Sequence, residues 1–297
     1  MQKSFVHSRK VWLALAMSLL LLPLNALNTS AGAGRSQQRT DALTPLQLQI
    51  EKQRQRLSSA DVEERREALT QLGAMHYPSA SRAAVAGLTD PAPIVRATAA
   101  TAILGLPAEE AVQSLSPLLS DKDEFVRQQA AYALGRTRSR AAVSPLIAAL
   151  GDKKDSVRGA AAVALGQIRD GAAAMPLAQL LDPQAGSAPG KKTKKVKKEQ
   201  NVFVLRAAAQ SLGQIKDVAG VPALIAVLQN EKAESDVRRE AAFALGEIRD
   251  ASAIPALRSV EASVDPYLAQ AAKEALGKIL ARRLATVMED THRPVIY

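Results

Sequence analysis

Residues that could carry acid–base or metal chemistry are few and scattered along this chain. The histidines are His7, His76 and His292, and no His-Glu pair occurs. Neither the Gly-x-Ser-x-Gly turn of serine hydrolases nor the His-Glu-x-x-His pair of zinc proteases is present. The chain has no cysteine, which excludes disulfides and thiolate ligands. We therefore expect no enzymatic activity, no cofactor and no metal site.

The densest charge is a lysine run inside the segment 186–200. This segment contains six Lys and one Glu, and so supplies half of the formal net charge of +10. Such a run is too polar to fold, which predicts a solvated loop. The alternative is electrostatic contact with an anionic partner such as lipid headgroups, a polyanionic glycan or an acidic protein. The candidate contacts are Lys191, Lys192, Lys194, Lys195, Lys197 and Lys198.

Two ligand classes are disfavoured for this segment. Gly190-Lys-Lys-Thr193 is not a phosphate-binding loop, because its upstream glycine is misplaced and no strand precedes it. Nucleic acid is not expected either, because the lysines are not interleaved with aromatic residues that would stack on bases.

A unit of about 31 residues occurs seven times along the chain, and these repeats must position any binding residues. Each copy centres on a glycine that is preceded by Leu at minus one and Ala at minus five. Steps of four residues place these side chains on one helical stripe. A fixed period in this range is typical of a solenoid. The glycines are Gly73, Gly105, Gly135, Gly166, Gly213, Gly246 and Gly277.

A second apolar segment follows each glycine and predicts a second helix in every unit. Asp170, Asp217 and Asp250 precede this segment in three copies, where a carboxylate can cap free backbone N–H groups. Proline falls early in it, where a missing N–H has little effect. No stretch alternates with period two for long enough to predict a strand. The fold class is therefore all-α.

Two segments of the chain carry a family resemblance. They are Ser156-Val-Arg-Gly-Ala-Ala-Ala-Val-Ala-Leu-Gly166 and Asp236-Val-Arg-Arg-Glu-Ala-Ala-Phe-Ala-Leu-Gly246. Both resemble the HEAT repeat, in the short variety of bilin-lyase-like proteins. The resemblance covers about residues 58–285 and implies an α-solenoid, a superhelix of about seven helix pairs. It also implies a ladder between repeats, in which a loop Asp meets the Arg that follows Val. The matching arginines are Arg127, Arg158 and Arg238, with Arg65 and Arg96 as looser matches.

The resemblance also sets limits on the ladder and on activity. Leu205 holds the ladder position in the fifth copy and Arg206 follows it, so we expect the ladder to be interrupted at the insertion. Iron-binding hydroxylases of the family carry repeated His-Glu pairs, which are missing here. Its bilin lyases act on cytoplasmic antenna proteins, whereas this chain carries a predicted export signal.

That signal is the N-terminal segment 1–33. Basic residues precede the apolar run Val11–Leu22, and Ala31-Gly32-Ala33 supplies small residues at the spacing that a signal peptidase reads. The chain is therefore predicted to be exported, to a bacterial periplasm or to the medium. An uncleaved N-terminal anchor is the alternative, and no other membrane span is expected.

The remaining segments complete the predicted organisation. Residues 34–57 are a polar linker and a capping helix, with Leu46, Ile50 and Leu57 on one side. Residues 58–285 are the repeats, with the insertion 186–200, and residues 286–297 are a tail beyond the last helix.

The residue three before each glycine points away from the core stripe and varies between units. Its aromatic members, Tyr132 and Phe243, are candidate anchors for a protein partner, or they pack against a neighbouring helix. We expect an exported, non-catalytic scaffold or adaptor that binds protein, and the resemblance favours docking on successive second helices. The alternatives are an enzyme or enzyme subunit of the bilin-lyase-like group and a binder of anionic envelope polymers.

Overall fold

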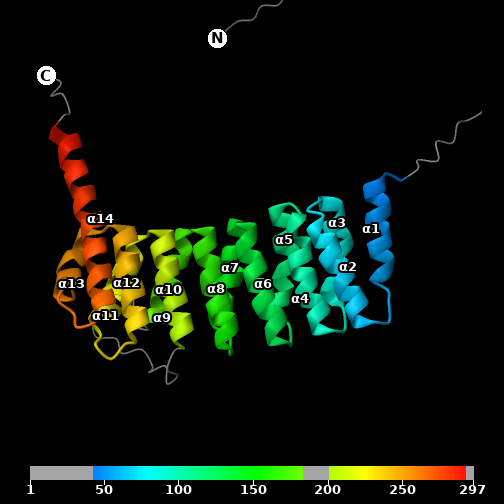
Figure 1. Ribbon diagram of the computed structural model, residues 1–297, viewed down its shortest axis with the longest axis horizontal. Helices are drawn as coiled ribbons and strands as arrows, with labels where there is room; N and C mark the ends of the chain where they lie inside the picture. Colours follow the sequence, from blue (N-terminus) through cyan, green and yellow to red (C-terminus); the bar gives the residue numbers. More distant parts are fainter. Residues whose placement is uncertain (1–42, 183–200, 292–297) are drawn as a thin grey trace, which may run out of the picture. The chain divides into compact units, whose positions relative to one another are not determined.

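The computed structural model describes residues 43–182 and 201–291, with side chains described as far as residue 284. Every regular element within these ranges is a helix or a short 3-10 turn (Figure 1). The predicted signal segment and the lysine run lie outside the described residues. No helix in the described ranges has the length and apolar character needed to cross a bilayer.

The repeats form two layers of helices. After α1 (Pro45–Arg56), the first helices of successive units pack against one another, and the short second helices form the other layer (Figure 1). The first helices are α2 (Val62–Ala74), α4 (Pro93–Ala102), α6 (Glu124–Thr137), α8 (Asp155–Ile168), α10 (Val202–Ile215), α12 (Ser235–Ile248) and α14 (Pro266–Thr291). The second helices are α3 (Pro78–Ala84), α5 (Ala108–Leu115), α7 (Val143–Ala149), α9 (Ala174–Leu181), α11 (Val221–Gln229) and α13 (Ile254–Ser259).

The core follows the stripe of Leu and Ala residues. The alanine at minus five is fully buried in every unit, and the leucine at minus one is buried in all units except the second. There Leu104 is only half-buried, and the neighbouring Ile103 is fully buried in its place. The reason is a slip of register, because Val95 and Arg96 stand one residue farther from Gly105 than their counterparts stand from the other glycines.

The repeated glycine marks a close approach between first helices. A Cβ added at Gly135 would lie 2.6 Å from the Ala164 Cα of the next first helix, and Gly73, Gly213 and Gly246 face an alanine in the same way. Since no side chain fits in that space, the residue must be glycine for α6 and α8 to pack at this distance. Gly277 lies on α14, after which no further first helix follows in the described residues, and it has no such neighbour.

A left-handed residue and a carboxylate cap separate the two helices of a unit. Arg138, Arg169, Lys216 and Arg249 adopt φ between 52° and 62° at the ends of their first helices. The predicted caps then follow, because Asp170, Asp217 and Asp250 each accept a backbone N–H two residues on. They cap a 3-10 turn that leads into the second helix.

The last helix departs from the predicted organisation. The predicted tail begins at residue 286, but α14 continues to Thr291. No glycine or proline occurs between Gly277 and Pro294, so the sequence contains no signal that would end the helix earlier. At the other end, α1 begins at a capping box formed by Thr44 and Gln47, and it packs against α2 and α3.

Candidate functional site

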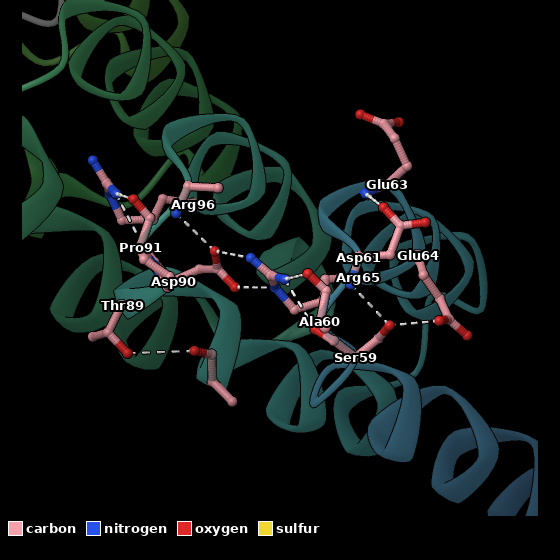
Figure 2. A network of polar contacts seen from close by, with 12 residues as sticks. Ser59, Ala60, Asp61, Glu63, Glu64, Arg65, Thr89, Asp90, Pro91 and Arg96 are labelled. Carbon is pink, nitrogen blue, oxygen red and sulfur yellow. Dashed lines mark hydrogen bonds and ion pairs between the residues drawn. The ribbon is translucent and has the colours of Figure 1, made fainter.

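Three arginines form a continuous ladder between the first repeats. Arg65 donates through Nε and Nη2 to both carboxylate oxygens of Asp90, at 2.7 and 2.9 Å. Its third nitrogen, Nη1, donates to the carbonyls of Ser59 and Ala60 (Figure 2). Each arginine therefore joins the loop before its own helix to the loop before the next first helix.

The same geometry repeats at the next two junctions. Arg96 donates to Asp121 at 2.7 and 2.8 Å, and Arg127 donates to Asp152 at 2.8 and 3.1 Å. The hydrogen bond from Arg96 lowers the pKa of Asp121 below its usual value. Burial raises the pKa of Asp152, but the hydrogen bonds from Arg127 and a backbone N–H outweigh it, so the net shift is downward. Such buried, bidentate pairs fix the packing of neighbouring repeats.

Further contacts occur at the ladder positions of the next two units. Arg158 donates to the carbonyl of Asp152 and pairs with Asp155 on its own helix. Leu205, at the ladder position of the fifth unit, is half-buried against the core, and Arg206 next to it contacts Asp236. The arginines with a described bidentate aspartate partner are Arg65, Arg96 and Arg127.

Arg238 requires a correction. Within residues 201–291 its described hydrogen bond goes from Nε to the Leu228 carbonyl at 3.0 Å, and no ion pair to an aspartate is formed. In the three full ladder pairs the aspartate stands 25 residues after the arginine, but Ser263 occupies that place here. Without a carboxylate at this position, Arg238 has no ladder partner.

The two candidate aromatic residues have different surroundings. Tyr132 on α6 is half-buried and packs against the core. Phe243 on α12 remains 40% exposed and lines two adjoining cavities. Phe243 therefore lies at a concave surface.

The first of these cavities lies across α10, α12 and α14. Its volume is about 320 Å³, and most of its lining surface is apolar. Tyr267, 70% exposed, belongs to it together with Phe243. The complete lining is Arg206, Asp236, Arg239, Glu240, Phe243, Tyr267 and Gln270.

The second cavity continues from the first along α10 and α12. It has a volume of about 270 Å³ and shares Glu240 and Phe243 with the first. Its other lining residues are Arg169, Gln210, Gly213, Gln214, Lys216, Ala244 and Glu247. We call the two cavities together the first-helix groove, since helices of the first layer form its walls.

The charges of the groove are largely paired. Asp236 contacts both Arg206, at 3.7 Å, and Arg239, whose guanidinium also lies 5.4 Å from the centroid of the Tyr267 ring. Glu247 accepts from Lys278 at 2.7 Å and lies 3.1 Å from Lys216, and these two ammonium groups lower its pKa to about 2.

Glu240 is the exception among these acidic groups. Burial raises its pKa, while the nearby charge of Arg206 opposes the shift. The sequence analysis did not identify Glu240, Tyr267 or Arg239, and it named Arg206 only as the neighbour of the ladder position. Phe243 and Gln210 both stand three residues before a repeat glycine, and both line the groove. That outward position is therefore the sequence feature that predicts part of the groove.

The remaining predicted residues are the six lysines of the insertion and the histidines. The six lysines Lys191, Lys192, Lys194, Lys195, Lys197 and Lys198 lie outside the described residues. His76 adopts φ of 55° at the turn between α2 and α3, as expected of a turn residue. In residues 43–182 and 201–291, no group of three His, Asp or Glu side chains is placed to hold a metal ion.

Comparison with known proteins identifies the family. A profile described as HEAT repeats matches residues 50–135, 115–187 and 193–277, so the chain belongs to the HEAT-repeat family. No curated protein matches the sequence.

Among the similar solved structures, one with a TM-score above 0.5 supports this fold. An X-ray structure of YibA from Escherichia coli is 20% identical with a TM-score of 0.54, over 78% of this chain and 81% of that one. The phycocyanin lyase complex of CpcE and CpcF from Nostoc is 21% identical with a TM-score of 0.47, over 87% and 99%. Human deoxyhypusine hydroxylase is 22% identical with a TM-score of 0.39, over 78% and 84%. At 20% identity the similarity to YibA concerns the fold alone.

Proposed function

We propose that this chain is an exported, non-catalytic adaptor that binds an extended segment of a protein partner in the first-helix groove. The family is one of protein-interaction repeats, and the groove supplies a concave surface on such a scaffold. The observation that carries the proposal is that two exposed aromatic rings from successive first helices, Phe243 and Tyr267, line one cavity. Aromatic side chains in pockets commonly dominate the binding energy of protein interfaces.

The proposed docking surface differs from the one expected from the resemblance. A cavity between second helices does exist, lined by Leu119, Pro145 and Ala148 among others, but it contains no aromatic residue. The first-helix groove joins aromatic rings and arginines on neighbouring helices, and both residue types are enriched at protein interfaces. We therefore place the partner on the first layer.

The test is differential capture by the mature chain from envelope extract. A partner retained by the wild-type chain should be lost from the double variant Phe243→Ala and Tyr267→Ala. The matched control is Phe125→Ala, which removes a ring that is 43% exposed on α6 and lies outside the groove. Equal capture by all three proteins would exclude the groove as the binding surface.

Export and the lack of catalysis have separate tests. The basic residues, apolar run and small residues of segment 1–33 support export, and N-terminal sequencing of protein from the envelope should begin at Gly34. The missing hydrolase and His-Glu motifs support a non-catalytic role. Stoichiometric iron in the purified chain would instead favour an enzyme of the bilin-lyase-like group.

A further inference from the structure

The carboxylate of Glu240 lies where the two cavities of the first-helix groove meet. It lines both cavities and is half-buried. Among the described residues no hydrogen bond or ion pair reaches it, and burial raises its pKa. An ionised carboxylate accepts hydrogen bonds only, and withdrawing it from water without a donor is unfavourable. The groove therefore contains an acceptor whose interaction a bound group could complete.

The two arginines of the first cavity are already engaged elsewhere. Arg206 and Arg239 both form ion pairs with Asp236, which stands one helical turn before Glu240 on α12. Arg239 is also held over the face of the Tyr267 ring. Because Asp236 receives both guanidinium groups, Glu240 is left to interact with a group from outside the chain.

The aromatic rings define the shape of that group. Phe243 shares both cavities with Glu240, and Tyr267 lies in the first of them. An aliphatic stem packs well on such rings while its charged end reaches a polar partner. The Arg239–Tyr267 contact shows that a ring of this groove accepts a cation on its face.

We propose that the groove recognises its partner through an arginine or lysine side chain, with the stem against Phe243 and the charged end paired with Glu240. This inference rests on the proposed function, because it names the partner chemistry of that same surface. A partner carboxylate would instead face Glu240 with Asp236 close by, and like charges in a partly desolvated site repel strongly. An acidic segment is therefore disfavoured.

The experiment is a selection of displayed random peptides on the immobilised full chain, followed by fluorescence anisotropy of the selected sequences. We expect the peptides to share a basic residue at one position. Replacing an arginine there by the neutral isostere citrulline should weaken binding about tenfold or more, because a charge-assisted hydrogen bond is lost. Glu240→Gln should have a similar effect.

The controls separate this inference from the proposed function. Glu261→Gln removes a half-buried carboxylate that lies outside the groove and should leave peptide binding unchanged. Suppose that peptide binding depends on Phe243 and Tyr267. If the peptides then share no basic residue, share an acidic one, or bind the Glu240→Gln variant as well as wild type, the role of Glu240 is overturned and the docking groove stays intact. Peptides insensitive to the double aromatic variant would overturn both. Thermal melts of each variant establish that it is folded.

Discussion

Single arginines determine how firmly the first repeats are joined. Arg96 is only 6% exposed, and its three guanidinium nitrogens donate hydrogen bonds to Asp121 and to the carbonyls of Asp90 and Pro91. Removing one member of a buried pair leaves the other without its counter-charge, which typically destabilises by about 3 kcal/mol or more. We expect Arg96→Ala to lower stability by this amount, as measured by chemical unfolding followed by circular dichroism.

A second pair of the same chemistry is the control for Arg96. Arg82 and Glu110 also form a bidentate contact, but their side chains are 57% and 39% exposed. Ion pairs in contact with water contribute little, so Arg82→Ala should change the unfolding midpoint far less than Arg96→Ala. Arg96→Lys should fall between them, because lysine keeps the charge but not the planar fork. Equal effects of the two alanine variants would contradict a special role for the ladder.

Glu247 makes stability depend on pH at the opposite end of the array. Lys278 and Lys216 lower its pKa from 4.5 to about 2. A carboxyl whose pKa is depressed by folding stabilises the native state above its unfolded pKa, and this contribution is lost as the pH falls through the folded pKa. Glu247→Gln should therefore lower the melting temperature at pH 7, and its difference from wild type should shrink from about pH 4.5 towards pH 2. A difference independent of pH would argue against this ion-pair network.

At the scale of helices, the repeated glycine can be tested by a pair of substitutions with opposite expected signs. Alanine is favoured over glycine within a helix by about 1 kcal/mol. At Gly135 the added methyl group would meet the Ala164 backbone at 2.6 Å, and overpacking of this kind costs roughly 1–3 kcal/mol. We expect Gly135→Ala to destabilise the protein.

Gly277→Ala is the matched substitution. It adds the same methyl group where nothing lies within 4 Å, so helix propensity should stabilise the protein by about 0.5–1 kcal/mol. Unfolding midpoints of both variants measure the comparison. Stabilisation by both would show that the first helices can separate without penalty.

The helices and the core stripe could be predicted from the sequence because both follow local periodicity. The slip in the second unit, where Ile103 replaces Leu104, shows that the stripe depends on the distance from Arg96 as well as on the glycine. The groove could not be predicted in the same way. It brings together Arg206, Glu240 and Tyr267 from three helices, and their spacing depends on how closely those helices pack.

Across the whole array, stability depends on contacts between neighbouring units. The fourth and fifth units are direct neighbours even though the insertion separates them in sequence, because α10 packs against both α8 and α9. Ser211 donates to the Ala162 carbonyl at 2.7 Å across this junction, and the Phe203 ring occupies the space that a Cβ at Gly159 would need. The stack therefore continues past residues 183–200.

Deleting residues 186–200 tests that continuity and the lysine run together. Helix α9 ends at Leu181 and α10 begins at Val202, so the deletion leaves five residues between them, as many as join α7 to α8. Shortening this connection fourfold should stabilise the fold by about 1 kcal/mol through loop entropy. The unfolding midpoint should therefore rise slightly or stay the same, and capture through the groove should be unchanged.

If partner affinity at low salt falls in the deletion variant while its melting curve is intact, the lysine run is a second, electrostatic contact. A loss of helical content would instead contradict direct stacking of the fourth and fifth units.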